Sequence, residues 1–134
     1  MILADSSAWI EYDRGTGSPV SERMLQLIGD EAELAVTEPV MMEVLAGARS
    51  DSREADLRRL LSRFPLLHFE ASADFDNAVR IYRRCRSAGI TPRGMLDCLI
   101  AAVAWREGAT LLANDSDMRR LAVVIGLPLD EASA

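Results

Sequence analysis

Short apolar runs alternate with longer segments of helical periodicity, and this alternation constrains the fold more than any other feature of the chain. The short runs are predicted to be strands at residues 2–4, 34–36, 66–69 and 110–113, with a further edge strand at 128–129. The segments between them are predicted to be helices, at residues 7–14, 20–28, 37–47, 51–63, 71–87, 95–105 and 115–125. Helices that join successive strands imply crossover connections, so we expect an α/β fold with a parallel sheet covered on both faces.

Length and composition indicate one ordinary globular domain. The chain has 134 residues, of which 49% are hydrophobic and 27% charged, enough to build one core and too apolar for disorder. The sequence contains no run of eighteen apolar residues, so no membrane span is predicted. The first residues lack a basic segment and include an acid at Asp5, so no signal peptide is predicted either. Cys85 and Cys98 lack the spacing of metal ligands and are expected to be buried thiols of a cytoplasmic protein.

The charged residues exclude several chemistries. All 15 basic residues are Arg, so a Walker-type phosphate loop, a Schiff base and a lysine general base are excluded. The 21 acidic residues give a net charge of −6, which disfavours nonspecific coating of nucleic acid. A local site can still have the opposite charge.

Acidic residues follow the predicted strands, at the sheet edge where parallel α/β proteins place their functional groups. Asp5 comes directly after the first strand, and Asp115 and Asp117 follow the fourth. Glu43 and Asp97 lie within two strongly apolar helices, where an unpaired carboxylate is costly to bury. We therefore expect these five side chains to converge at one edge of the sheet.

Converging carboxylates repel one another unless a cation neutralises them. Oxygen ligands without His or Cys select Mg²⁺ or Mn²⁺, and such ions assist displacement at phosphorus. Each acid also has a simpler interpretation. Asp5 and Asp115 can be helix N-caps, and Asp117 can complement the dipole of a first helical turn. Asp97 can pair with Arg93, and Glu43 with an Arg of the next helix.

The remaining polar candidates carry less chemistry. His68 is the single histidine and lies in a strand, which disfavours a role as general base. Ser7 has no histidine to activate it, but it can hydrogen-bond to Asp5 or to a metal-bound water. Two arginine-rich helices, over 51–63 and 71–87, are typical of solvated faces, although Arg also suits phosphate.

Four segments together resemble the VapC toxins of bacterial type II toxin–antitoxin pairs, which are PIN-domain ribonucleases. They are ILADSSAW at 2–9, EPVMMEVLAGA at 38–48, DCLIAA at 97–102 and ANDSDM at 113–118. Their order and spacing match the family across essentially the whole chain, so the resemblance implies a single PIN domain over residues 1–134. Met118 replaces a common Phe and Ser6 a frequent Thr, and neither change removes an acid.

The resemblance implies a three-layer PIN-like fold with about five parallel strands and a Mg²⁺- or Mn²⁺-dependent endoribonuclease that acts as a dimer. Its carboxylates would be Asp5, Glu43, Asp97 and Asp115, which serve as catalytic residues and metal ligands. Asp117 would adjoin the metal, and Ser7 would support the site. It also implies a VapB-type antitoxin that blocks the site, and a tRNA or ribosomal RNA substrate. The arginines expected to contact RNA are Arg80, Arg83, Arg84 and Arg93.

Two other functions remain open from the residues alone. A haloacid-type phosphatase would use Asp5 as a covalent nucleophile, but it would prefer a second acid where this chain has Ser7, and a Lys. A non-catalytic protein-binding module would use the same acids to receive an Arg of its partner. Nothing in the sequence chooses the RNA target, the number of metal ions or the carboxylate that acts as base.

Overall fold

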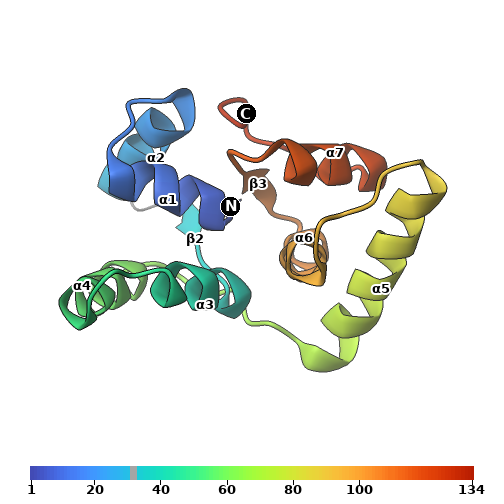
Figure 1. Cartoon of the computed structure of the whole chain (residues 1–134), viewed down its shortest axis with the longest axis horizontal. Coiled ribbons are helices and arrows are strands. Elements are labelled where there is room, and N and C mark those ends of the chain that lie inside the picture. The colour runs from blue at the N-terminus through green and yellow to red at the C-terminus, as the bar shows by residue number, and fades with distance from the viewer. Residues whose placement is uncertain (31–32) are drawn as a thin grey trace.

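The computed structural model of the chain describes residues 1–30 and 33–134, and it alternates short strands with helices (Figure 1). The elements in chain order are β1 (Ile2–Ala4), α1 (Ser6–Arg14), α2 (Pro19–Asp30), β2 (Leu34–Ala35), α3 (Glu38–Ala46), α4 (Asp51–Leu61), α5 (Ala71–Ser87), α6 (Met95–Glu107), β3 (Thr110–Leu112) and α7 (Ser116–Ile125). Every predicted helix is present within the described residues, most of them within two residues of the expected ends. The differences at helix ends reach two residues in α2, which continues to Asp30, in α4, which ends at Leu61, and in α6, which continues to Glu107.

The sheet is parallel, and its first strand lies at the centre. The strand order is β2-β1-β3, with Ile2 paired with Leu34 on one side and with Thr110 on the other. The chain therefore builds outward from β1 in both directions, and the order reverses between β1 and β3. In sheets of this kind, sites form beyond the carboxyl ends of the strands at such a reversal.

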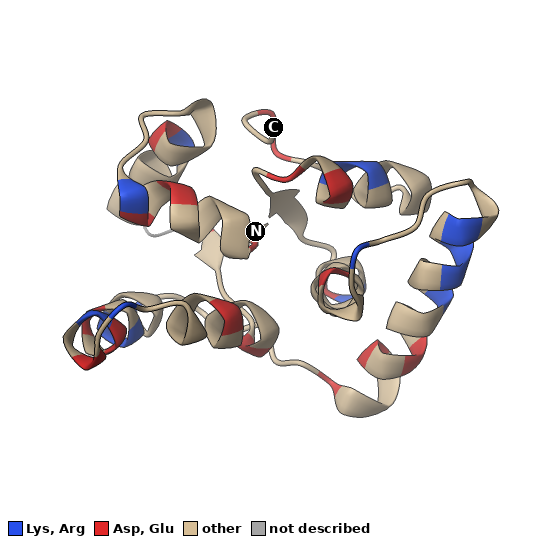
Figure 2. Ribbon diagram, viewed as in Figure 1, with Lys and Arg blue, Asp and Glu red and all other residues tan. Residues whose placement is uncertain are grey.

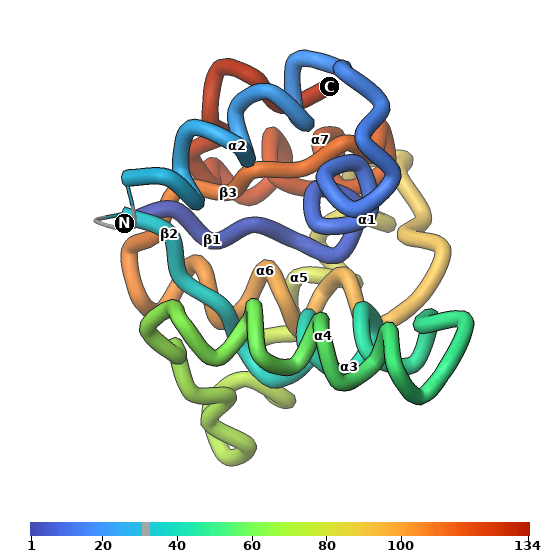
Figure 3. The backbone as a smooth tube through the Cα atoms, turned by 90° about the vertical axis from the view of Figure 1, so that its left-hand side faces the viewer, coloured from blue at the N-terminus to red at the C-terminus, as the bar shows by residue number. Residues whose placement is uncertain are grey.

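Helices cover both faces of the sheet, as the sequence predicts. Figures 1 and 3 show α1, α2 and α7 on one side of the strands and α3, α4, α5 and α6 on the other. The strands are buried because each face carries helices, which explains their nearly continuous apolar sequence. Across the described residues, no helix is long and apolar enough to span a membrane.

The prediction of about five strands is wrong for the described residues, which form three. The segments expected to be strands at 66–69 and 128–129 make only single parallel bridges, Leu66 to Val36 and Leu129 to Leu111. Beyond Leu66 the backbone turns to other partners: the Phe69 N–H donates to the Glu38 carboxylate (2.8 Å), and the His68 carbonyl accepts from Arg106 (2.7 Å). These side-chain contacts replace the ladder bonds that a longer strand would need.

The carboxyl end of β2 differs from the expected helix cap. Thr37 occupies the N-cap position of α3, but its side chain makes no capping hydrogen bond, and its buried hydroxyl has no partner among the described residues. Pro39 in the first turn of α3 removes one of the amide groups that a cap would satisfy, so the helix starts without the side-chain bond.

The core lies between the sheet and its helices. Leu3, Leu111 and Leu112 are fully buried in the strands, and Ile100 and Val103 of α6 pack in the same cluster. Both cysteines are free thiols buried in this core, on α5 and α6.

Candidate active site

Two hydrogen bonds from the next three residues fix the Asp5 carboxylate at the carboxyl end of β1. Its side chain caps α1 by accepting from the Ala8 N–H (3.2 Å), and the Ser7 hydroxyl donates to the same carboxylate oxygen (2.5 Å). The Ser7 oxygen also accepts the Asn114 N–H (2.8 Å), which ties the start of α1 to the end of β3. Asp5 is 3% exposed, so this carboxylate is held rigidly in a nearly dry position.

Asp115 and Asp117 form an ion-paired cluster at the start of α7. Asp115 is the N-cap and accepts from the Asp117 N–H (2.9 Å). Arg93 donates to Asp115 (2.9 Å) and also pairs with Asp117, which in turn pairs with Arg120. Asp5 and Asp115 thus both cap helices, as the simpler interpretation of each expects. These two caps place the Asp5 and Asp115 carboxylates beyond the carboxyl ends of the neighbouring strands β1 and β3.

Glu43 comes to the site from α3. The Ser6 hydroxyl, in the first turn of α1, donates to its carboxylate (2.5 Å). The sequence interpretation that pairs Glu43 with an Arg of the next helix is wrong within the described residues, which give Glu43 no ion pair. Asp5 and Glu43 therefore each receive a hydroxyl from adjacent serines of α1, which brings α3 to the same end of the sheet.

Asp97 lies in the first turn of α6 and faces the other acids. Burial, together with the charges of Asp115, Glu43 and Asp117, raises its pKa to about 6, while the charge of Arg93 opposes the shift. The expected ion pair of Asp97 with Arg93 is absent from the described contacts, because the Arg93 guanidinium pairs with the two α7 acids instead. Asp97 is thus a half-buried carboxylate to which the described part of the chain offers no ion-pair partner.

The pKa values of the central acids show that the group converges. Burial and the charges of Asp97 and Asp115 raise the pKa of Asp5 to about 7, against the opposing hydrogen bonds from Ser7 and Ala8. The charge of Asp115 raises the pKa of both Asp5 and Asp97, and the charge of Glu43 raises the pKa of Asp97. The acids positioned by α1, α3, α6 and α7 therefore lie close enough to interact electrostatically. Figure 2 shows acidic residues on α3, α6 and the start of α7 around this end of the molecule.

This arrangement suits a divalent cation by its donor chemistry and its charge. All the candidate ligands are carboxylate oxygens, the type that Mg²⁺ and Mn²⁺ prefer. Across residues 1–30 and 33–134, however, no three acidic, histidine or cysteine side chains lie close enough to coordinate an ion as they stand. The raised pKa values of Asp5 and Asp97 nevertheless mark excess negative charge that a cation would relieve.

The arginines predicted to contact RNA are divided between two places. Arg80 pairs with Asp76 on the exposed face of α5, and Arg83 and Arg84 line a hollow of about 440 Å³ in the last turns of the same helix. Figure 2 shows the run of basic residues along this helix. Arg93 is the one member of the predicted set that contacts the acids among the described residues.

Sequence reasoning did not assign a role to Ser6, nor to the Asn114 N–H. Ser6 follows Asp5 directly, but the residue it supports is Glu43, thirty-seven positions away. The Asn114 amide belongs to a predicted strand end, and a backbone donor leaves no mark in the sequence. Only the packing of α1 against α3 and β3 reveals these contacts.

Comparison with known proteins places this geometry in a family context. The family model described as PIN domain matches residues 2–124. Ribonuclease VapC11 from Mycobacterium tuberculosis is 43% identical over 128 residues, which cover 95% of this chain and 96% of the relative.

Solved structures with low sequence identity share the fold. The crystal structure of VapBC2 from Rickettsia felis, bound to a promoter DNA fragment, matches with a TM-score of 0.75 and 19% identity, covering 97% of this chain and 98% of that chain. VapC20 from Mycobacterium tuberculosis, described as a sarcin–ricin loop cleaving toxin, matches with a TM-score of 0.67 and 17% identity, covering 89% and 93%.

Proposed function

This chain belongs to the PIN-domain family, as a homologue of the VapC ribonucleases of toxin–antitoxin systems, and on that premise we propose that it is a Mg²⁺- or Mn²⁺-dependent endoribonuclease toxin. It would cleave phosphodiester bonds in structured RNA, either tRNA or ribosomal RNA, and so inhibit translation and growth. The observation that carries the proposal is the pair of carboxylates with raised pKa, Asp5 and Asp97, beside further acids at the strand-order reversal.

In this proposal Asp5, Glu43, Asp97 and Asp115 hold the cation, and Asp117 adjoins it. PIN-domain nucleases are typically metal-dependent, and the all-oxygen donor set supports Mg²⁺ or Mn²⁺. A bound ion would lower the pKa of the attacking water and would compensate negative charge on the phosphate oxygens. Ser7 keeps the Asp5 carboxylate oriented through its hydrogen bond.

The carboxylates also suit the proton transfer that hydrolysis requires. With pKa values of about 7 and about 6, Asp5 and Asp97 can each accept a proton from water near neutral pH.

Arg93 would act on the substrate side of the same site. Its side chain is 70% exposed although it pairs with Asp115 and Asp117. With a cation held by these acids, the exposed guanidinium would be available to bind an RNA phosphate in a bidentate manner. We propose that Arg80, Arg83 and Arg84 on α5 provide further phosphate contacts along the strand.

The partner in this proposal is a VapB-type antitoxin that neutralises the toxin by blocking the acidic site. VapBC2 from Rickettsia felis, a toxin–antitoxin pair with a similar fold, supports the assignment. A small reading frame with a DNA-binding pattern immediately upstream of the gene would identify the antitoxin. Coexpression of its product should then restore growth.

The test of the proposed activity is the Asp97→Asn variant. This change removes charge but little volume, so we expect RNA cleavage in Mg²⁺ to fall by a factor of at least about 10² with the fold retained. Glu22→Gln, which removes an exposed acid from the first turn of α2, is the matched control and should cleave like the wild type. Sequencing of RNA 5′ ends after induction identifies the cleaved RNA.

The outcomes separate the competing functions. Cleavage by Asp97→Asn at the wild-type rate would refute the assignment of this residue to the active site. Turnover of a small phosphomonoester without action on RNA would instead favour the haloacid-type phosphatase. For a non-catalytic binding module, calorimetry should detect no Mg²⁺ or Mn²⁺ site that Asp97→Asn weakens.

A further inference from the structure

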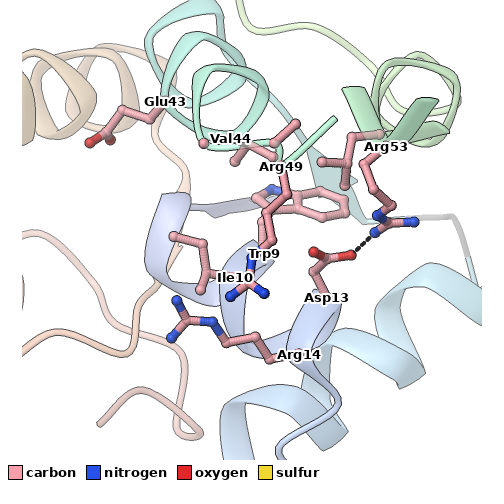
Figure 4. A pocket seen from close by; sticks show the side chains of 11 residues that line it. Trp9, Ile10, Asp13, Arg14, Glu43, Val44, Arg49 and Arg53 are labelled. Carbon is pink, nitrogen blue, oxygen red and sulfur yellow. Dashed lines mark hydrogen bonds and ion pairs between the residues drawn. The ribbon is translucent and has the colours of Figure 1, made fainter. Parts of the chain in front are cut away.

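A basic pocket lies beside the acidic site, on the other side of Glu43. It has a volume of about 640 Å³ and is formed by α1, the turn between α3 and α4, and α4. We call it the Arg14–Arg49 pocket, after the two arginines that line it together with Arg53. Figure 4 shows these three side chains around Trp9, with the Glu43 carboxylate pointing away from them.

Two of the three guanidinium groups are available for an anion. Arg53 is held by Asp13, a member of the same lining. Arg14 and Arg49 make no ion pair or side-chain hydrogen bond with any residue that the structure describes. The acid whose charge interacts with Arg14 is Glu11, and its carboxylate already accepts from hydroxyl groups of Thr16 and Ser18. Two guanidinium groups in one pocket are therefore without an ion-pair partner among the residues that the structure describes, and a bound phosphate would provide one.

The rest of the lining is apolar and suits a nucleoside attached to that phosphate. Val44 and Leu57 are 6% exposed and form buried walls, whereas Ile10 is 39% exposed and presents an open apolar surface. Trp9 also lines the pocket, and its buried indole N–H has no acceptor among the described residues. A pocket that combines free guanidinium groups with apolar walls matches a nucleotide better than a simple anion.

The pocket is continuous with the acidic site through one residue. Glu43 belongs to its lining, and the same carboxylate accepts from Ser6 in the first turn of α1. Trp9 and Ile10 follow Ser6 within the same helix. The first turns of α1 and the Glu43 side chain thus border both the acids and the basic pocket.

We propose that the Arg14–Arg49 pocket binds a phosphodiester group and its attached nucleoside next to the cleaved bond of RNA. This inference rests on the proposed ribonuclease function and adds a binding subsite to it. Arg14 and Arg49 bind the phosphate oxygens, and the apolar wall packs against the sugar and base. The pocket thus supplies the locally basic surface that an acidic protein needs in order to bind RNA.

The test compares RNA binding by two variants in the Asp97→Asn background, which keeps the RNA intact. One carries Arg14→Gln and Arg49→Gln, and the matched control carries Arg59→Gln, which removes an exposed charge from α4 outside the pocket. With a labelled single-stranded RNA oligonucleotide, we expect the double variant to bind at least ~10-fold more weakly. Its affinity should also depend less steeply on salt, by about 0.7 in the logarithmic slope, the value for one phosphate of a single strand.

Cleavage by the otherwise wild-type enzyme gives an independent readout. Arg14→Gln with Arg49→Gln should raise KM for bulk tRNA or ribosomal RNA and change kcat little, because the pocket binds the strand and not the reacting atoms. Equal affinity, salt slope and KM in the double variant and in Arg59→Gln would overturn the proposal. Unchanged RNA affinity together with lost antitoxin binding would assign the pocket to the protein partner instead.

The two proposals fail in distinguishable ways. If the wild type cleaves RNA and the double variant behaves like the Arg59→Gln control, only the pocket assignment is wrong. If the wild type cleaves no RNA but the double variant loses RNA affinity, the pocket is a nucleotide site and the nuclease assignment is wrong. RNA that fails to bind to any variant would overturn both.

Discussion

At the scale of single residues, the raised pKa values of Asp5 and Asp97 predict how stability depends on pH. In the unfolded chain these carboxyls ionise near 3.8, whereas in the fold burial and neighbouring acids raise the pKa values to about 7 and about 6. Their contribution to stability is therefore complete below about pH 4 and is lost as the pH rises toward 7. Thermal denaturation in EDTA should show this loss as the difference between the wild type and Asp5→Asn.

Divalent cations should reverse this dependence. Mg²⁺ or Mn²⁺ favours the ionised carboxylates, so added metal should stabilise the wild type more at pH 7 than at pH 5. Asp97→Asn should reduce this metal-dependent stabilisation. A wild-type melting temperature that responds to metal equally at both pH values would contradict the assignment of the raised pKa values to this site.

Ser7 links two strand ends through one hydroxyl, and this link predicts a second effect. Ser7→Ala removes the donor to Asp5 and leaves the Asn114 N–H without its acceptor. We expect a loss of about 1–3 kcal/mol in the free energy of unfolding and a further rise in the Asp5 pKa. Chemical denaturation at several pH values measures both, and Ser72→Ala on the exposed face of α5 provides the control.

The pairing of Arg93 shows what residue spacing could not predict. A separation of four positions suggested an ion pair with Asp97 along one helix face. Arg93, however, precedes Gly94, the N-cap of α6, so its side chain does not follow helical geometry. It reaches the start of α7 instead. The acids were evident in the sequence because strand ends are local features, whereas their partners depend on how distant segments pack.

At the scale of elements, the contact between α5 and α6 includes a buried ion pair. Asp74 is fully buried and accepts two hydrogen bonds from Arg106 (2.9 Å each), which hold its pKa below the ordinary value although burial acts to raise it. Arg106→Ala should leave this carboxylate buried and unpaired, at a cost of about 3–5 kcal/mol in the free energy of unfolding. Urea denaturation at neutral pH measures this cost.

The exposed pair on the same helix serves as the control for this prediction. Arg80 and Asp76 lie on the solvent face of α5, so Arg80→Ala should change stability by less than about 1 kcal/mol. Similar losses in the two variants would mean that the buried pair contributes no more than a surface contact does. The loss in Arg106→Ala should shrink at low pH, where Asp74 becomes protonated in both variants.

The strand pattern was predictable only in part, and the exceptions have a common cause. The runs at 2–4, 34–36 and 110–113 overlap strands because both neighbours in the sheet are present or nearly so. The runs at 66–69 and 128–129 lie at the two edges, and the first follows Pro65 while the second begins with Pro128. A run of hydrophobic residues predicts that a segment is buried. The number of hydrogen bonds that it forms with a neighbouring strand depends on which backbone lies beside it, and the sequence does not reveal that.

At the scale of the whole molecule, we expect a homodimer. The resemblance to VapC toxins implies one, and several large apolar side chains are exposed on helices of this small domain, among them Met42, Phe75, Trp105 and Val123. Sedimentation equilibrium should give twice the chain mass of 14.7 kDa at micromolar concentration. A single species at the chain mass would contradict the expectation.

The central position of β1 also affects how the protein is made. Ile2 needs Thr110 as a sheet neighbour, and the Ser7 hydroxyl that orients Asp5 needs the Asn114 amide, so neither contact can form until the ribosome has released most of the chain. The nascent toxin therefore has its first carboxylate long before it has a working site. This delay gives the cell time, during each round of synthesis, to supply an inhibitor before catalysis becomes possible.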